Sequence, residues 1–467
     1  MACITDDGFH EECGVFAICA PGMDVAHLTY LGLFALQHRG QEGCGMAVWK
    51  DGNIQFHKRL GLVNDVFNEE ILESLPGSVA IGHVRYATTG ETSELNTQPI
   101  VAQYYQGQLA LAHNGNLTNT EALREALAKT GSLFQTATDT EVLCNLLARY
   151  AENSLDVAME KAMAELEGSY ALVAINDGKI FAARDPYGNR PLCIGKLAEN
   201  AGYVVASESC ALDTIEAEFV RDVEPGEILV IDETGIHTAA KVPSPRSAHC
   251  IFEYVYFARP DSTIDGVNVN QSRRRMGAIL ARETGDLDVD IVIPVPDSGT
   301  TAAIGYAEAS GKQFTQGILK NRYTARTFIQ PTQAMREKMV KLKLSPIREE
   351  IGGKRVAVVD DSIVRGTTSK RLVALLRERG AAEVHMLITC PPVLYPCYYG
   401  IDTAERDKLI AANHSLEEIR QYINADSLHY ISLEGLYEAV GSDDKYCVAC
   451  LNGDYCLGHP NCKKKQS

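Results

Sequence analysis

The sequence lacks two features that would place a protein at a membrane or on nucleic acid: long apolar runs and a basic surplus. Its 467 residues include 61 acidic and 44 basic side chains, which gives a formal net charge of −17. Because contacts with nucleic acid phosphates need a basic surface, this charge argues against nucleic acid as a main partner. No apolar run approaches the ~20 residues of a membrane-spanning helix, so we expect no membrane span.

A secretion signal is also missing, since the first dozen residues are acidic and polar. We therefore expect a cytoplasmic protein whose thiols stay reduced. Cysteine is nevertheless common, with 14 residues. In a reducing compartment these cysteines are expected to be catalytic, metal-binding or simply buried, rather than paired in disulfides. The length allows two or three domains.

One stretch in the C-terminal third predicts a strand, a loop and a helix. Val356 to Val359 is a short, apolar and mostly β-branched run, which is typical of a buried strand in a parallel sheet. Two acids follow, and Ser369 is placed to cap a helix that stops at Gly380. Residues 384–389 indicate the next strand. Such a βαβ unit places its loop where open α/β sheets bind ligands.

The residues of this loop suit a ribose 5-phosphate group. Backbone N–H groups of residues 365–369, at the predicted helix N-terminus, suit a phosphate monoester. Asp360 and Asp361 would accept hydrogen bonds from vicinal hydroxyls or help to hold Mg²⁺. The alternative is an ordinary strand–turn–helix with acidic turn residues. A Walker loop is excluded because no Gly-Lys-Ser/Thr is present here.

The stretch resembles the phosphoribosyl pyrophosphate (PRPP) loop of type I phosphoribosyltransferases. The resemblance implies that PRPP is bound by Asp360, Asp361, Ser362, Arg365, Gly366, Thr367, Thr368 and Ser369. It also places the pyrophosphate loop of that family at residues 296–301. There Ser298 would share Mg²⁺ with Asp360 and Asp361.

The N-terminal half carries five short motifs. They are, in chain order, Cys13-Gly-Val-Phe, Gln37-His-Arg-Gly-Gln, Gly82-His-Val-Arg-Tyr, His113-Asn-Gly-Asn-Leu and Thr138-Asp-Thr-Glu. Alternating strand patterns at 45–115 and 169–230, with helical patterns at 22–37, 119–129 and 140–165, indicate sheets packed under helices. The first four motifs resemble the N-terminal-nucleophile (Ntn) glutaminase domain. Joined to a PRPP loop, they resemble the glutamine PRPP amidotransferase family.

This resemblance implies a fold class of α/β and α+β. An Ntn-hydrolase αββα glutaminase sandwich is expected first, followed by a type I phosphoribosyltransferase with a doubly wound parallel sheet. The implied divisions are a propeptide at 1–12, the glutaminase domain at 13–240, a linker with a cluster ligand at 241–270, the phosphoribosyltransferase domain at 271–430 and a C-terminal segment with cluster ligands at 431–467.

Cys13 is the candidate nucleophile of the glutaminase. A thiol needs a base, and if residues 1–12 are removed, the freed α-amino group, with a reference pKa near ~8, can serve as that base. A buried structural cysteine is the alternative. By resemblance, Arg85 binds the glutamine α-carboxylate and Asp139 the α-ammonium. Asn114 and the Gly115 N–H would form the oxyanion hole, although Asn-Gly alone is also a common hairpin turn.

Four further cysteines are the expected metal ligands: Cys250, Cys397, Cys447 and Cys450. They match the cysteines that hold a [4Fe–4S] cluster in the branch of the family that also has a propeptide. Four thiolates suit such a cluster. The alternative is structural zinc, because Cys456, His459 and Cys462 supply further ligands in the tail.

Residues 320–343 hold seven basic side chains and one acid within an acidic protein. A solvated charged face is the usual explanation. Here the stretch lies between two predicted anion-binding loops, so we expect a mobile lid that closes over PRPP. The resemblance further implies a homotetramer inhibited by purine nucleotides.

The implied reaction converts PRPP, glutamine and water into 5-phosphoribosylamine, glutamate and pyrophosphate, the first committed step of purine synthesis. A non-catalytic PRPP-sensing regulator is one rival, but it would need a DNA-binding segment and a basic surface. A related Ntn amidotransferase making a sugar amine or asparagine is another. That rival lacks support because the second domain carries a PRPP loop.

Overall fold

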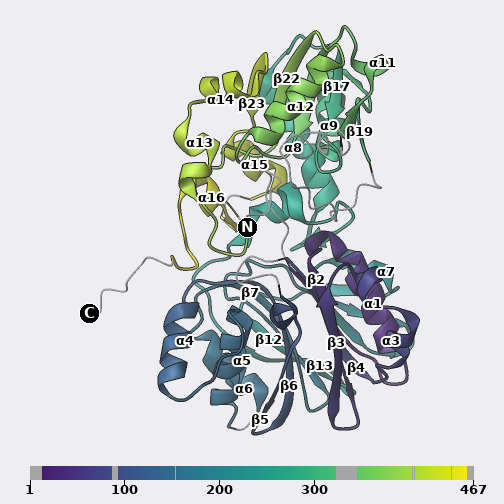
Figure 1. Cartoon of the computed structure of the whole chain (residues 1–467), viewed down its shortest axis with the longest axis vertical. Helices are drawn as coiled ribbons and strands as arrows, with labels where there is room; N and C mark the ends of the chain where they lie inside the picture. The colour runs from purple at the N-terminus through teal and green to yellow at the C-terminus, as the bar shows by residue number, and fades with distance from the viewer. Residues whose placement is uncertain are drawn as a thin grey trace.

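The computed structural model describes residues 13–86, 93–152, 154–321, 344–401, 403, 405–442 and 444–459. The expected propeptide, most of the expected basic lid and Cys462 therefore lie outside the described residues. Figure 1 shows two halves stacked along the long axis, with the N-terminal half in purple and blue and the C-terminal half in green and yellow.

Two antiparallel sheets form the centre of the N-terminal half. The first has the order β11-β9-β10-β1-β4-β2-β3 and the second has the order β13-β12-β8-β7-β6-β5. The strands of the first sheet are β1 (Gly14–Cys19), β2 (Gly43–Lys50), β3 (Asn53–Leu60), β4 (Val79–Arg85), β9 (Cys193–Lys196), β10 (Tyr203–Ala206) and β11 (Glu218–Asp222). Those of the second are β5 (Ile100–Tyr104), β6 (Gly107–Leu117), β7 (Gly168–Asn176), β8 (Lys179–Arg184), β12 (Glu227–Asp232) and β13 (Gly235–Lys241).

Successive side chains of a strand point to opposite faces of its sheet, so three apolar cores form: one between the two sheets and one under the helices on each outer face. On β1, Val15 and Ala17 point into the core between the sheets, whereas Phe16 and Ile18 point into the core under the helices. The covering helices are α1 (Val25–Ala35), α3 (Glu69–Glu73) and α7 (Ser209–Thr214) on one side, and α4 (Thr120–Lys129), α5 (Asp139–Tyr150) and α6 (Leu155–Met163) on the other. The αββα sandwich is thus confirmed (Figure 1).

The helix expected at 140–165 is two helices. Ala151 leaves the helical region with a ψ of 60°, and Ser154 is the N-cap residue of α6. Both helices place apolar residues in the core against the second sheet. The helical pattern at 140–165 is thus confirmed, although the sequence did not show where one helix ends and the next begins.

A parallel sheet with the order β18-β17-β21-β22-β23 forms the C-terminal half. Its strands are β17 (Ile291–Pro294), β18 (Gln313–Phe314), β21 (Arg355–Asp360), β22 (Glu383–Ile388) and β23 (Ser427–Tyr430). All four neighbouring pairs are parallel. Numbered along the chain, the order is 2-1-3-4-5, which is a doubly wound sheet whose topological switch point lies between β17 and β21.

Helices cover both faces of this sheet, as expected for a parallel sheet with two buried faces. One face packs against α8 (Val269–Thr284), α9 (Thr300–Ser310) and α15 (Leu433–Val440), and the other against α12 (Thr367–Glu378) and α14 (Leu416–Ile423). The predicted phosphoribosyltransferase sheet is therefore confirmed (Figure 1).

The remaining helices and strands are short. They are η1 (Gln37–Arg39), α2 (Val63–Val66), η2 (Glu94–Asn96), η3 (Ala198–Asn200), β14 (His249–Cys250), η4 (Glu253–Phe257), β15 (Thr263–Ile264), β16 (Val267–Asn268), β19 (Ile318–Lys320), β20 (Leu344–Pro346), α11 (Arg348–Ile351), η5 (Arg406–Lys408), α13 (Ile410–Asn413), β24 (Tyr446–Cys447) and α16 (Ala449–Asn452). Within the described ranges, none of the helices has the length and apolarity to cross a membrane.

Candidate active sites

Cys13 lies immediately before β1, at the end of the strand where β4 also ends. The register places Gly14 opposite Val84, so Cys13 and Arg85 share this end of the sheet. The Cys13 thiol donates a hydrogen bond to the Tyr86 carbonyl at 3.4 Å. The Cys13 carbonyl accepts one from Nε of Arg39 at 3.1 Å. Backbone and side-chain contacts thus hold Cys13 beside the candidate glutamine-binding arginine.

Two buried polar side chains here have no hydrogen-bond partner among the described residues. Both terminal nitrogens of Arg85 and both polar atoms of the Asn114 amide are unpaired, although these residues are only 3% and 1% exposed. Leaving such groups unpaired costs about 1–3 kcal/mol each, more for a charged one. A buried amide and guanidinium in this state fit a ligand that supplies an oxygen to each, such as the amide and carboxylate of glutamine.

Asp139 begins α5 and completes this constellation. Its carboxylate accepts a hydrogen bond from the Leu117 N–H at 3.3 Å and lies 3.6 Å from Nδ1 of His113. Burial opposes ionisation, but His113 and the backbone N–H groups still hold the pKa of Asp139 below its usual value. A buried carboxylate that stays ionised is suited to binding an ammonium group.

A buried ionic network behind Cys13 was missed by the sequence analysis. Arg39 donates from Nη1 to Glu208 at 2.5 Å and to Glu253 at 2.9 Å. Glu208 also contacts His38 at 2.7 Å and accepts from the Ser262 hydroxyl at 2.7 Å. Burial acts against these charges, yet His38 and Arg39 hold the pKa of Glu208 well below its usual range. The arginine in the Gln-His-Arg-Gly motif was the one available signal for this network.

In the C-terminal half, the loop after β21 meets the loop after β17 at the switch point of the sheet. The Ser298 hydroxyl donates to one oxygen of Asp361, and the Ser362 hydroxyl donates to the other at 2.5 Å. Burial, and then the neighbouring carboxylate, raises the pKa of Asp360 well above its usual value. Burial likewise raises the pKa of Asp361, while Ser298 and Ser362 oppose the shift.

The helix that follows begins earlier than the sequence indicated. Ser369 was expected to cap it, but α12 begins at Thr367 with Gly366 as the N-cap, and Ser369 lies buried in the first turn. Gly366 has a φ of +78°, which only glycine adopts readily and which turns the chain directly into the helix. The first-turn N–H groups still point out of the helix start, as a phosphate site requires.

The residues at this loop fit Mg²⁺ by their chemistry. Ser298, Asp360 and Asp361 offer hard oxygen ligands. A bound cation would favour the ionised carboxylates and so lower the raised pKa values of the two aspartates. No three His, Cys, Asp or Glu side chains within the described ranges are arranged to hold one ion. A protein Mg²⁺ site usually has one or two carboxylates that act together with substrate phosphates.

Three of the four candidate cluster cysteines are buried in one lobe, and Cys397 is partly exposed. Parallel pairing of β14 with β24 places Cys250 directly beside Cys447. The Cys450 carbonyl accepts hydrogen bonds from residues 394 and 395, which leads the chain to Cys397. We call residues 249–250, 394–401 and 446–459 the cysteine lobe.

These thiols lie close enough to influence one another. Burial raises the pKa of the Cys450 thiol, and the charges of Cys397, Cys390 and Cys250 add to the shift. The Cys397 sulfur accepts a hydrogen bond from the Tyr399 N–H at 3.3 Å, a contact that stabilises thiolate ligands of iron–sulfur clusters. In a cluster each thiolate binds a different iron, so the ligands need not converge on one ion.

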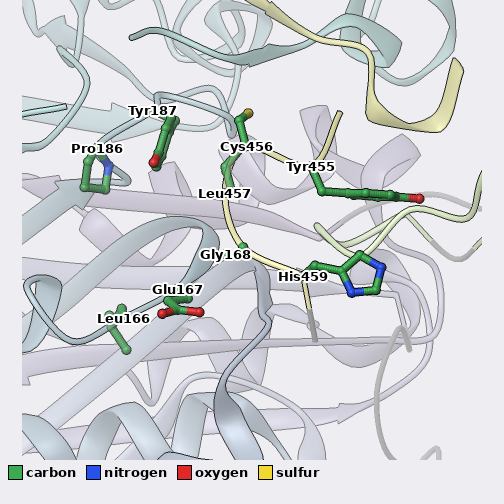
Figure 2. Close-up of a pocket in the computed structure, with 10 residues that line it drawn as sticks. Leu166, Glu167, Gly168, Pro186, Tyr187, Tyr455, Cys456, Leu457 and His459 are labelled. Atoms are coloured by element: carbon green, nitrogen blue, oxygen red, sulfur yellow. The ribbon is translucent and has the colours of Figure 1, made fainter. Parts of the chain in front are cut away.

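Cys456, the candidate zinc ligand, lies next to the lobe. Its thiol hydrogen-bonds with Cys447 and with the Arg246 guanidinium, and the contact with Cys447 lowers the pKa of Cys456 to about 7. Figure 2 shows Cys456 with Tyr187 and His459 around a pocket of about 380 Å³ between the cysteine lobe and the N-terminal half. Cys462 lies outside the described residues.

Comparison with known proteins shows the family to which the chain belongs. The glutamine amidotransferase domain profile matches residues 83–214. The chain is 48% identical to the amidophosphoribosyltransferase of Archaeoglobus fulgidus, over 96% of this chain and 98% of that relative. It is 47% identical to the amidophosphoribosyltransferase of Bacillus subtilis, over 96% of this chain and 94% of that relative.

A solved structure extends this similarity to the whole fold. The glutamine PRPP amidotransferase of Bacillus subtilis, complexed with ADP and GMP, matches with a TM-score of 0.90 and 47% identity. The match covers 95% of this chain and 97% of that one. The chain therefore belongs to the amidophosphoribosyltransferase family, whose enzymes join a glutamine amidotransferase to a phosphoribosyltransferase.

Proposed function

We propose that this amidophosphoribosyltransferase works through two separate sites, with Cys13 as the glutaminase nucleophile and the 360–369 loop as the PRPP site. The overall reaction converts PRPP, glutamine and water into 5-phosphoribosylamine, glutamate and pyrophosphate, as the first committed step of purine synthesis. The observation that carries the assignment is the unpaired, buried pair Arg85 and Asn114 beside Cys13. A buried guanidinium and amide that have no hydrogen-bond partner within the described ranges support a substrate that has both a carboxylate and an amide.

Glutamine binds with its α-carboxylate on Arg85 and its α-ammonium on Asp139. Removal of residues 1–12 frees the α-amino group of Cys13, which takes the thiol proton. The thiolate then attacks the side-chain amide carbon, and the oxyanion accepts hydrogen bonds from the Asn114 amide and the Gly115 N–H. The α-amino group returns its proton to the leaving nitrogen, which departs as ammonia, and water hydrolyses the thioester to glutamate.

In the second site, ammonia attacks C1 of the ribose and displaces pyrophosphate. Asp360 and Asp361 accept hydrogen bonds from the ribose hydroxyls, and the N–H groups at the start of α12 hold the 5-phosphate. Ser298 with the two aspartates would hold Mg²⁺, which when bound supplies neutralisation of the pyrophosphate charge. The protein contributes positioning, because the loops after β17 and β21 meet at one end of the sheet.

Three finer features are part of the proposal. Cys250, Cys397, Cys447 and Cys450 hold a structural [4Fe–4S] cluster, supported by the Cys250–Cys447 pairing and the N–H contact to Cys397. The enzyme is inhibited by purine nucleotides, supported by the ADP and GMP bound to the Bacillus subtilis relative. It is a cytoplasmic homotetramer, by family resemblance.

A nitrogen-source experiment tests the two-site assignment. Cys13→Ala removes the nucleophile, so glutamine-dependent synthesis is lost while ammonia-dependent synthesis is largely kept. Cys19→Ala, a buried cysteine at the far end of the same strand, is the matched control and keeps both activities. If folded Cys13→Ala loses both activities, the assignment of two separate sites is wrong. An intact-mass measurement of the same protein reports whether residues 1–12 are removed.

A further inference from the structure

One of the contacts between the cysteine lobe and the second sheet of the N-terminal half lies next to the candidate oxyanion residue Gly115. The Asn116 side-chain amide donates a hydrogen bond to the Tyr398 carbonyl at 2.9 Å. The Ser169 hydroxyl donates to the Tyr399 carbonyl at 2.6 Å, and the Arg190 guanidinium donates to the same oxygen. Two side chains from the sheet, and Arg190 from the connection between β8 and β9, thus bind two consecutive carbonyls of the lobe.

Gly115 lies close to both the sheet strand β7 and the cysteine lobe. A methyl group placed on Gly400 would lie 3.3 Å from the carbonyl carbon of Gly115 and 3.4 Å from its Cα. A methyl group placed on Gly115 itself would lie 2.2 Å from the Ser169 carbonyl oxygen on β7. The Gly115 peptide is therefore packed closely against both β7 and the lobe residue Gly400.

The lobe segment next to Gly115 is fixed by hydrogen bonds within the C-terminal half. The Cys397 N–H donates to the Thr403 hydroxyl at 2.6 Å, and the Tyr399 hydroxyl donates to the Gly458 carbonyl at 3.0 Å. The Ser169 hydroxyl, which donates to the lobe, also accepts from the Asn116 N–H at 3.4 Å. This hydroxyl therefore ties the strand next to Gly115 to the lobe.

We propose that Asn116 and Ser169 are positioning residues that use the 398–400 segment of the lobe to hold the Gly115 N–H on the oxyanion. This inference rests on the proposed role of Asn114 and Gly115. An oxyanion donor works only when it is fixed about 2.7–3.1 Å from the developing charge. Because a misplacement of ~1 Å can cost ~100-fold in rate, a rigid layer behind the donor has a direct effect on turnover.

Two substitutions test the proposal, Asn116→Ala and Ser169→Ala, because each removes one donor to the lobe. We expect kcat for glutamine hydrolysis in the presence of PRPP to fall at least ~10-fold, while KM for glutamine changes less than ~2-fold. Ammonia-dependent synthesis is expected to stay at the wild-type rate. Tyr455→Phe, which removes a 2.5 Å hydrogen bond to the Pro396 carbonyl within the same lobe, is the control and keeps kcat.

Alkylation of Cys13 by iodoacetamide separates positioning from general damage. Alkylation forms no oxyanion, so both variants should react at the wild-type rate. An equal fall in alkylation and hydrolysis in both variants would show disturbance of the nucleophile itself and would overturn the proposal, as would an unchanged kcat. Asn114→Ala distinguishes the two levels of inference. If Asn114→Ala leaves kcat unchanged, the oxyanion assignment is wrong. If Asn114→Ala lowers kcat but Asn116→Ala and Ser169→Ala do not, only the positioning role is wrong.

Discussion

Arg39 donates two hydrogen bonds to the carboxylate of Glu253, at 2.9 and 2.6 Å, and both side chains are buried. Arg39 also binds the Cys13 carbonyl, so it connects the nucleophile to the segment that leads into the C-terminal half. Glu253 is the first residue of η4. The backbone carbonyl of the next residue, Tyr254, accepts a hydrogen bond from the Arg273 guanidinium of α8. Burial lowers the pKa of Arg273 to about 10, and the carboxylate of Asp361 opposes this shift. Hydrogen bonds therefore connect α8 and η4, through Glu253 and Arg39, to the nucleophile Cys13.

Glu253→Gln removes one carboxylate charge from this network and leaves Arg39 buried with a weaker partner. Breaking a buried ion pair typically costs about 3–5 kcal/mol, and the remaining amide and Glu208 place the expected loss near ~3 kcal/mol. We also expect glutamine-dependent synthesis to fall more than ammonia-dependent synthesis, because Arg39 holds the Cys13 carbonyl. Chemical denaturation and paired nitrogen-source assays measure the two effects.

The exposed pair Arg282–Glu438 provides the control for that variant. Its side chains are 61% and 54% exposed, and exposed ion pairs contribute about 0–1 kcal/mol. Glu438→Gln should therefore change both stability and the ratio of the two activities very little. Equal stabilities for the Glu253→Gln and wild-type proteins would show that the buried network does not stabilise the fold.

Asp361→Asn is expected to reduce synthesis from both nitrogen sources. The carboxylate accepts from the Ser298 and Ser362 hydroxyls, so it joins the two loops at the switch point of the sheet. An amide group offers one acceptor oxygen and no charge for a divalent cation. Steady-state assays with ammonia should show a higher KM for PRPP, a lower turnover, or both. Asp286→Asn, which is 96% exposed, is the control, and normal PRPP kinetics in Asp361→Asn would make the assignment wrong.

Local patterns in the sequence predicted the sheets and the βαβ unit. These patterns are the spacing of apolar residues and the acidic residues of a turn, and both involve only residues that are close together in the sequence. They did not reveal the Arg39 network, whose partners Glu208 and Glu253 lie 169 and 214 residues away along the chain. Only tertiary packing brings them together. The same limit explains Ser369, where the φ of Gly366 set the helix start instead of a side-chain cap. The proposed residue roles remain predictions.

Asp222 should make part of the stability depend on pH. Burial, and then the charge of Asp265, raises its pKa from 3.8 to about 6, while Arg184 opposes the shift. The folded protein thus binds this proton more tightly than the unfolded chain does. Its contribution is fully present below about pH 4 and is lost as pH rises through about 6, an effect of at most about 3 kcal/mol.

Asp222→Asn removes this titration and keeps an oxygen for the backbone N–H groups of residues 265 and 266. Relative to the wild type, the variant should therefore gain melting temperature between pH 5 and pH 7. Asp213→Asn, an exposed substitution in α7, controls for the lost charge. An identical pH dependence of melting in wild type and Asp222→Asn would contradict the prediction.

Iron content tests the cysteine lobe. Cys250, Cys397, Cys447 and Cys450 come from distant parts of the chain, so a shared cluster would close long loops and restrict the unfolded chain. Cluster binding also adds to the folding free energy when the unfolded chain lacks the site. We expect brown protein with about four iron and four sulfide per chain, the stoichiometry of a [4Fe–4S] centre. Oxygen should bleach the protein and then inactivate it.

Substitution separates the cluster from zinc. Cys447 is buried and paired in register with Cys250, so Cys447→Ser should leave poorly folded protein, not a folded enzyme with altered kinetics. Cys456 is less buried and contacts Cys447 from the pocket side, so Cys456→Ser should keep iron, sulfide and folding. Cys462→Ser should be equally mild. One zinc per chain without sulfide, together with an indispensable Cys456, would instead identify a zinc site, because zinc takes four ligands on one ion and the tail cysteines would then complete its shell.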